Sequence, residues 1–314
     1  MRLEESTHGT RGGEGAGRVE GAAGGPPLAR PAPRQEWAIG VYAGDSPLSL
    51  APAEGARNPV ITRRDVSDVP ALFVADPFMI RRGRLWFMFF EVLNALTGLG
   101  EIGLAESDDG LAWRYRRIVL SEDFHLSYPH VFEHEGEFYM TPETLGLNRV
   151  ALYKARSFPE GWERVGTLVE GACADPTPFR HEGRWWLYAC TEPKTHDTLS
   201  LYHAEELSGP WSQHPRSPLL SGDRQRARPA GRVVSHAGRL VRFAQDCSPI
   251  YGARVRAFAI NSLTVEEYAE GELPESPVLS PGREVWNGCR MHHLDAHEVG
   301  RGRWLACVDG DATA

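Results

Sequence analysis

Residues able to do acid–base chemistry recur in pairs at steady intervals along this 314-residue chain. One member of each pair stands near the start of an extended run, in four cases directly before a proline, and the other follows the next glycine and apolar run. Paired carboxyl groups can exchange protons with a bound substrate. The pairs are Asp76 and Glu91, Tyr128 and Glu143, Asp175 and Glu192, Arg228 and Asp246, and His293 and Asp309.

The elements that carry these pairs form an internal repeat. Prolines at positions 77, 129, 176 and 229 are separated by 52, 47 and 53 residues, and a fifth unit lacks the proline. Short aromatic runs divided by glycine at this period are typical of a β-propeller with about four strands per blade. Five units therefore predict an all-β, five-bladed β-propeller.

The first two runs of each unit are expected to form a hairpin, so the start of one strand lies beside the end of the next. All five pairs should then meet on one face of the ring, opposite the turns at Gly83, Gly136 and Gly183. A single acidic residue at a strand end can simply cap a turn or face water. Five polar pairs in one register favour a shared functional site.

Residues 1–34 differ in composition from the rest of the chain. They are rich in Gly, Ala, Arg, Glu and Pro and have few large apolar side chains, which predicts a disordered tail before a propeller domain at 35–314. The strand-like run Trp37–Tyr42 is expected to close the ring against the last blade. The tail lacks the apolar core of a secretory signal, no run reaches membrane-span length, and five cysteines without metal-ligand spacing suggest reduced thiols, so we expect a cytoplasmic protein.

Net charge narrows the range of partners. With a formal net charge of −8, the chain lacks the basic surface that binding to nucleic acid requires, so we expect no nucleic acid as a partner. It also has neither the phosphate-binding loop of nucleotide hydrolases nor the Gly-x-Ser-x-Gly turn of serine esterases. A small-molecule or glycan substrate, with no cofactor, is the remaining expectation.

Two local clusters each allow two interpretations. Four arginines (Arg224, Arg226, Arg228 and Arg232) can clamp a phosphate or carboxylate, or can form surface ion pairs in a solvated loop. In the run His292-His293-x-Asp295-x-His297, alternate residues can converge on a metal ion. We favour no metal there and expect His293 to hydrogen-bond substrate.

Several longer phrases of the sequence are more specific than the repeat. They are His125-Leu126-Ser127-Tyr128-Pro129-His130-Val131-Phe132, Met140-Thr141-Pro142-Glu143, Arg228-Pro229-Ala230-Gly231-Arg232, Gln245-Asp246-Cys247-Ser248 and Met291-His292-His293. Through them, the region from Trp37 to Gly310 is similar to the propeller domain at the N-terminus of the plant glucosamine inositolphosphorylceramide transferases, a distant relative of the family 43, 32 and 130 glycosidases. The resemblance implies a glycosidase-like propeller.

The resemblance only partly transfers a catalytic set. Family 43 hydrolases use an Asp base, a second Asp on the next blade and a Glu acid on the third. Asp76 matches the base, but Tyr128 or His130 stands at the second position. The acid must come from a strand end such as Glu143 or Glu192. We assign Asp76 as general base, Glu143 as general acid and Asp175 to sugar hydroxyls. The expected substrate-binding residues are Glu91, Tyr128, His130, Glu192, Arg228, Asp246 and His293.

Three classes of function fit this sequence. The first is a glycoside hydrolase-like enzyme that uses axial carboxylates on a glycan or glycoconjugate. The second is a glycosyltransferase or phosphorylase on the same fold, in which the arginines would hold phosphate. The third is a non-hydrolytic binding module or a recruited biosynthetic enzyme, which the incomplete family triad favours.

Overall fold

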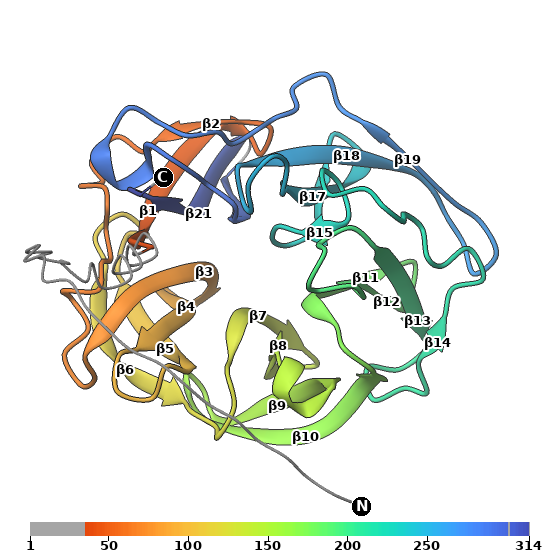
Figure 1. Ribbon diagram of the computed structural model, residues 1–314, viewed down its shortest axis with the longest axis horizontal. Coiled ribbons are helices and arrows are strands. Elements are labelled where there is room, and N and C mark those ends of the chain that lie inside the picture. The colour runs from red at the N-terminus through yellow and green to blue at the C-terminus, as the bar shows by residue number, and fades with distance from the viewer. Residues whose placement is uncertain (1–34, 301, 314) are drawn as a thin grey trace, which may run out of the picture. The chain divides into compact units, whose positions relative to one another are not determined.

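The computed structural model describes residues 35–300 and 302–313, and its strands form five antiparallel sheets arranged in a ring (Figure 1). Each sheet is one blade, and this confirms the all-β, five-bladed propeller. Blade I contains β3 (Ala71–Arg82), β4 (Leu85–Asn94), β5 (Gly100–Ser107) and β6 (Arg114–Leu120). Blade II contains β7 (Ser127–His134), β8 (Glu137–Glu143), β9 (Arg149–Ser157) and β10 (Glu160–Glu170).

The remaining blades follow the same plan. Blade III contains β11 (Ala174–His181), β12 (Arg184–Cys190), β13 (Leu199–Ala204) and β14 (Ser212–Gln213). Blade IV contains β15 (Arg228–Pro229), β16 (Val234–His236), β17 (Arg239–Asp246), β18 (Arg254–Leu263) and β19 (Tyr268–Glu272). Blade V contains β20 (Leu294–Gly300), β21 (Arg303–Asp311), β1 (Trp37–Ser46) and β2 (Ser49–Pro52), and two 3-10 helices, η1 (Leu145–Leu147) and η2 (Val285–Asn287), lie in connections.

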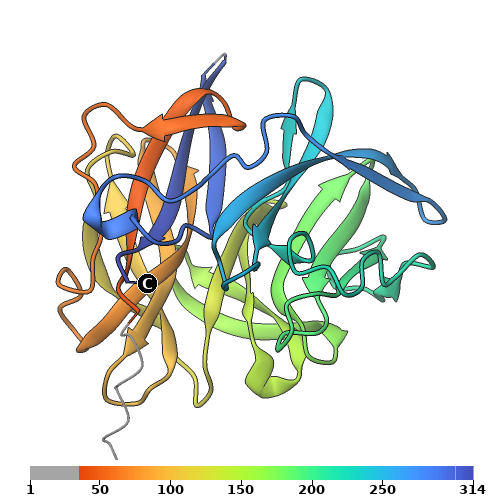
Figure 2. The ribbon, with the colours of Figure 1, turned by 45° about the horizontal axis from the view of Figure 1, so that its top comes forward.

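Blade V closes the ring by joining strands from both ends of the described chain. In its sheet β1 lies between β2 and β21, with Trp37 opposite Asp311 and Tyr42 opposite Ala306. Figure 2 shows β1 running alongside β21 within this blade. The expected closure by Trp37–Tyr42 is confirmed, and pairing on both sides leaves β1 with no open edge.

Apolar side chains fill the spaces between neighbouring blades. Between blades I and II, for example, Phe78, Phe89 and Trp162 belong to one buried cluster. Burial of a large apolar side chain stabilises the fold by about 1.5–3 kcal/mol relative to exposure. The aromatic packing holds the inner strands at fixed positions around the axis.

Three inner strands, β3, β7 and β11, share the same unusual backbone conformation at one residue. Asp76, Tyr128 and Asp175 each precede a proline and have positive φ angles of 52°, 48° and 51°. The strand pairing also shifts by one residue at each of these points, as in a β-bulge. Because non-glycine residues rarely adopt positive φ, these three positions store strain where the inner strands reach the axis.

The proposed tail, residues 1–34, lies outside the described residues. Within the described part of the chain, no helix is long and apolar enough to cross a membrane. The described cysteines form no disulfide, and four of the five are buried.

Candidate functional site

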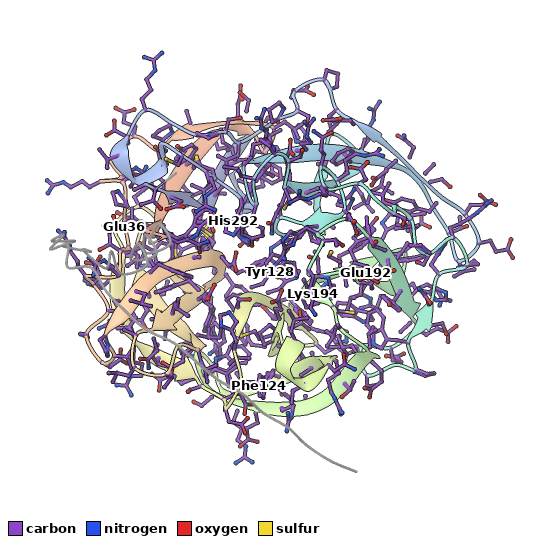
Figure 3. All side chains as sticks on the ribbon, in the orientation of Figure 1. Glu36, Phe124, Tyr128, Glu192, Lys194 and His292 are labelled. Carbon is purple, nitrogen blue, oxygen red and sulfur yellow. The ribbon has the colours of Figure 1, made fainter. Side chains whose placement is uncertain are left out.

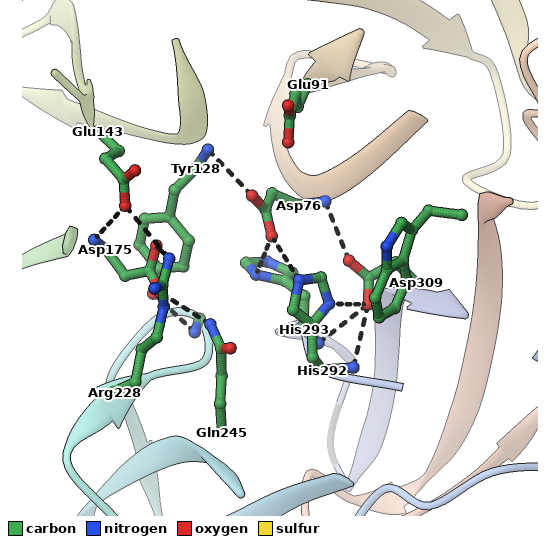
Figure 4. A network of polar contacts seen from close by, with 12 residues as sticks. Asp76, Glu91, Tyr128, Glu143, Asp175, Arg228, Gln245, His292, His293 and Asp309 are labelled. Carbon is green, nitrogen blue, oxygen red and sulfur yellow. Dashed lines mark hydrogen bonds and ion pairs between the residues drawn. The ribbon is translucent and has the colours of Figure 1, made fainter. Parts of the chain in front are cut away.

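Polar side chains from all five blades meet near the axis of the ring, and Figure 3 labels Tyr128 and His292 among them. The turns at Gly83, Gly136 and Gly183 join the opposite ends of the same hairpins, as predicted. We call this group the axial cluster, and most of its members are buried. It comprises Asp76, Glu91, Tyr128, Glu143, Asp175, Arg228, Gln245, His292, His293 and Asp309 (Figure 4).

Backbone amides join successive blades around the axial cluster. Asp309 Oδ2 accepts the N–H of Asp76 at 3.0 Å, and Asp76 Oδ2 accepts the N–H of Tyr128 at 3.3 Å. Glu143 Oε2 likewise accepts the N–H of Asp175 at 3.2 Å. Each residue with positive φ therefore turns its amide toward a carboxylate of the preceding blade. The strained backbone is part of how the carboxylates are positioned.

One half of the cluster is built around Arg228. Its Nε and Nη2 donate to the two oxygens of Asp175 at 2.6 and 3.3 Å, and Nη2 also lies 3.3 Å from Glu143 Oε2. Gln245 Nε2 donates to Asp175 Oδ2 at 2.7 Å. Such forked contacts are strong and geometrically specific. Asp175 is fully engaged, and the charge of Arg228 is already balanced by carboxylates.

Glu143 differs from an ordinary surface carboxyl group. Burial raises the pKa of Glu143 to about 7, although the positive charge of Arg228 opposes this rise. Its side chain is 8% exposed. Near neutral pH, Glu143 can therefore both hold a proton and release it.

The other half of the cluster contains histidines. His292 Nδ1 lies 2.7 Å from Asp309 Oδ1, while His292 Nε2 lies 3.5 Å from Asp76 Oδ1. His293 Nδ1 lies 3.9 Å from the same Asp76 oxygen. Burial opposes ionisation of Asp309, but His292 holds the pKa of Asp309 below its ordinary value.

Asp76 is buried near other acidic groups. Burial and the charges of Asp175 and Asp309 raise the pKa of Asp76 well above its ordinary value. Among the described residues, Asp76 Oδ1 and both ring nitrogens of His293 have no hydrogen-bond partner. Unpaired buried polar atoms are costly, so these atoms mark a place where a ligand atom would be stabilised.

Tyr251 contacts both halves of the axial cluster. Its ring centroid lies 5.4 Å from that of His292, and the guanidinium of Arg228 lies 5.2 Å from the Tyr251 centroid. Asp76 and Glu143 are each only 6% exposed. Both carboxyl groups are therefore largely shielded from solvent. A surface hollow of about 460 Å³ beside Trp37 has none of the axial cluster in its lining.

The remaining predicted residues lie in different surroundings. Glu91 belongs to the cluster and its Oε1 lies 3.2 Å from His125 Nε2. His130 is buried and stacks on Phe78, with ring centroids 4.7 Å apart. Glu192 is exposed in the connection after β12. The structure thus places Glu192 and His130 in surroundings unlike those of the axial carboxylates.

Asp246 requires a correction to its expected place beside Arg228. In the β15–β17 pairing Arg228 lies opposite Gln245, while Asp246 is held by Arg254 and Arg256 at 3.7 and 2.8 Å. Successive strand residues point to opposite faces, so only one of the two neighbours can face the axis. Gln245 and His292 are the members that sequence reasoning missed. The alternation of side chains along a strand could have identified Gln245, in place of Asp246, as the residue that faces the axis.

The run from His293 to His297 does not converge on one point. Asp295 instead accepts Arg232 Nε at 2.8 Å and pairs with His297 Nε2 at 2.9 Å, whereas His293 faces Asp76. Three contacts thus occupy Asp295, since its Oδ2 also accepts the N–H of Met79 at 2.8 Å. The interpretation in which His293, Asp295 and His297 together bind one metal ion is therefore wrong.

Comparison with solved structures supports the fold. β-1,2-Mannobiose phosphorylase from Listeria innocua aligns with a TM-score of 0.62 at 12% identity, covering 87% of this chain and 97% of that one. A thermostable family-43 glycoside hydrolase aligns with a TM-score of 0.58 at 14% identity, covering 82% of this chain and 91% of that one. At such low identity, these likenesses show a shared propeller fold.

Comparison of sequences is more specific. Glucosamine inositolphosphorylceramide transferase 1 from Oryza sativa subsp. japonica is 38% identical over 298 residues, and that from Arabidopsis thaliana is 38% identical over 296. The alignments cover 88% of this chain but only 40% and 39% of those proteins. The profile of the family described as glucosamine inositolphosphorylceramide transferase 1, N-terminal, matches residues 30–311. The chain therefore belongs to the family of N-terminal domains of glucosamine inositolphosphorylceramide transferase 1.

Proposed function

We propose that this chain acts on a glycan or glycoconjugate and that its axial cluster cleaves a glycosidic bond. Glu143 would protonate the leaving oxygen and Asp76 would activate the attacking water. Such cleavage needs two carboxyl groups that flank the bond, one to give a proton and one to assist the nucleophile. The observation that carries the proposal is the pair of buried carboxyl groups, Asp76 and Glu143, on neighbouring blades of the axial cluster, and burial raises the pKa of Glu143 to about 7.

The surroundings of Glu143 suit a general acid. A catalytic acid works best when its pKa lies near the operating pH. Arg228 remains 3.3 Å from Glu143 and would stabilise the carboxylate that forms once the proton has moved to the leaving group. The same contact would make proton release easier during the reaction.

Asp76 can act as the base once it is ionised, and its raised pKa makes that carboxylate a stronger proton acceptor. Oδ2 is fixed by the amide of Tyr128, while Oδ1 is free of hydrogen bonds and faces His292 and His293. Its free oxygen can accept a proton from a water that is held beside these rings. Asp175 has both oxygens engaged, so we now propose that it positions Arg228, in place of the expected contact with sugar hydroxyls.

A second candidate function is glycan binding within a transferase. The chain spans about 40% of the length of the plant transferases that it matches, so transfer chemistry can belong to the part that it does not match. The propeller would then hold a sugar-containing acceptor. A phosphorylase role is less well supported, because the carboxylates of Asp175 and Glu143 already balance the charge of Arg228.

The test is turnover of a panel of chromogenic aryl glycosides, with products identified by NMR in the presence and absence of inorganic phosphate. Asp76→Asn and Glu143→Gln should each lower the rate about 100- to 10,000-fold, as loss of acid–base catalysis does. Glu135→Gln, at a side chain that is 79% exposed, is the control and should keep the rate of the parent protein.

Each outcome has a distinct meaning. Parent-like rates in both axial variants would contradict the carboxylate mechanism. A sugar phosphate product would replace hydrolysis with phosphorolysis. Saturable glycan binding that the axial variants lose, without turnover of any glycoside, would favour the binding function instead.

A further inference from the structure

We propose that Asp76, His292 and His293 bind a divalent transition-metal ion at the propeller axis, with Asp309 orienting His292. The chain was not expected from its sequence to bind a metal here. The proposal stands on the geometry of the histidine half of the axial cluster. The ion would occupy the Asp76 oxygen that accepts a proton in the proposed cleavage, so it would compete with that step, and its binding can be measured without turnover.

The candidate ligand atoms lie close to the spacing that a metal requires. His292 Nε2 and His293 Nδ1 are 3.5 and 3.9 Å from Asp76 Oδ1. Two ligands bound tetrahedrally at about 2.0–2.1 Å from zinc are roughly 3.4 Å apart. The His292 distance matches this spacing, and the ring of His293 would have to turn slightly for its nitrogen to match it. Asp76, His292 and Asp309 also have ligand atoms within 4.8 Å of one another.

Asp309 fixes which nitrogen of His292 faces the proposed ion. An ionised carboxylate only accepts hydrogen bonds, so the 2.7 Å contact with Asp309 Oδ1 requires the proton on His292 Nδ1. In the neutral ring, the lone pair then lies on Nε2, which faces Asp76. Metal-binding histidines commonly donate their other ring N–H to a carboxylate in this way. Stacking on Trp37, with centroids 4.1 Å apart, further fixes the ring of His292.

Unpartnered polar atoms point independently to a missing ligand. His293 is 0% exposed, and neither of its ring nitrogens has a hydrogen-bond partner among the described residues. Asp76 Oδ1 is also buried and unpartnered. One cation would contact the free oxygen and a nitrogen of His293 together. No protein donor among the described residues does so.

The ligand types indicate the class of ion. Two imidazole nitrogens and one carboxylate oxygen suit Zn²⁺, Mn²⁺ or Fe²⁺, whereas Ca²⁺ and Mg²⁺ prefer oxygen ligands. The surrounding charge also favours a cation, because Asp76, Asp309 and Glu91 lie in the buried cluster while Arg228 is paired with Asp175 and Glu143. Three protein ligands leave a position for water or a substrate oxygen.

The experiment uses tag-free protein that has been stripped with a chelator and then titrated with ZnCl₂, MnCl₂, CaCl₂ or MgCl₂ by isothermal calorimetry. We expect one ion per chain for Zn²⁺ or Mn²⁺ and weaker binding of Ca²⁺ and Mg²⁺. His292→Ala and His293→Gln should weaken binding by more than the roughly 10- to 100-fold loss expected for Asp309→Asn, which changes the group that orients His292 and accepts backbone N–H groups but leaves the three proposed ligands in place.

His181→Ala is the matched control, since it removes a histidine on β11 with a 34% exposed side chain and should bind like the parent protein. Circular dichroism of the metal-free variants verifies that each one folds. Equal affinity in the parent and His292 and His293 variants would overturn the proposal, as would absence of Zn²⁺ and Mn²⁺ binding by the parent. Anomalous scattering at the metal absorption edge should place the ion beside Asp76, and a peak elsewhere would also contradict the site. Metal binding without glycoside turnover would leave this inference standing while the proposed cleavage fails.

Discussion

Trp37 stacks on His292, with ring centroids 4.1 Å apart and planes inclined by 27°. Trp37 belongs to β1, the strand that closes blade V, and His292 belongs to the axial cluster. One aromatic contact therefore links closure of the ring to the orientation of a functional side chain. Arg290 lies over the Trp37 ring at 4.9 Å, so the indole is held between two cationic or polarisable groups.

Trp37→Ala should destabilise the propeller by about 3–5 kcal/mol, as truncation of a buried tryptophan commonly does. It should also weaken Zn²⁺ binding, because the ring of His292 loses its stacking partner. Denaturant unfolding and calorimetric titration measure the two effects. Trp162→Ala, at a buried site in β10, is the control and should lower stability while leaving metal affinity unchanged. If Trp37→Ala and Trp162→Ala lower the Zn²⁺ affinity equally, the stacking on Trp37 does not orient His292 for metal binding.

Glu143→Gln should change how stability depends on pH. The pKa of Glu143 in the folded protein, about 7, lies above the ordinary 4.5, so its stabilising contribution is complete below about 4.5 and is lost as the pH rises through 7. The melting temperature of the parent relative to the Gln variant should therefore fall between pH 5 and about 8. A constant difference across this range, measured by calorimetry, would show that Glu143 titrates normally.

The rate of glycoside cleavage should decline as the pH rises through about 7. Glu143 must carry a proton to act as the acid, and its pKa is about 7. The measurement is kcat/KM against pH with an aryl glycoside whose leaving group needs protonation. A substrate with a very acidic leaving group should show a weaker alkaline decline. Identical profiles for both substrates would argue against the role of Glu143.

Arg228→Met should destabilise the protein by about 3–5 kcal/mol, since removing one partner leaves buried charges uncompensated. Loss of the guanidinium should also raise the pKa of Glu143 further, and this would move the alkaline limb of the rate profile to higher pH. Arg114→Met, at a 64% exposed side chain, is the control for removal of an arginine and should change neither property. If the alkaline limb of the pH–rate profile stays at the same pH in Arg228→Met, Arg228 does not lower the pKa of Glu143.

The fold could be predicted because each blade repeats the same local pattern. The hairpin register was also correct in blades I and II, where Ala75 and Ser127 pair with Glu91 and Glu143. Glu192 was misjudged because β12 ends at Cys190, so this residue lies beyond the strand. Neighbouring strand residues face opposite ways, and a shift of one residue exchanges Gln245 for Asp246.

The chemistry of the histidine half was less accessible from sequence. His292 and His293 are adjacent and lie outside the strands, so no strand periodicity indicates that both approach Asp76. The positive φ values of Asp76, Tyr128 and Asp175 were equally hidden, since residues before proline usually adopt extended conformations. Tertiary packing around the axis decides these features.

The pairing of β1 with β21 also determines where attached sequence would emerge. Trp37 lies directly opposite Asp311. Trp37 stacks on His292 of the axial cluster, and Asp311 follows Asp309 of the same cluster by two residues in β21. A domain joined close to Trp37 or Asp311 would thus be tethered near the axial cluster. A short flexible linker there would hold the joined domain at an effective concentration of about millimolar relative to the axial cluster. A ligand released from one of the two would then be able to bind the other even if that binding is weak.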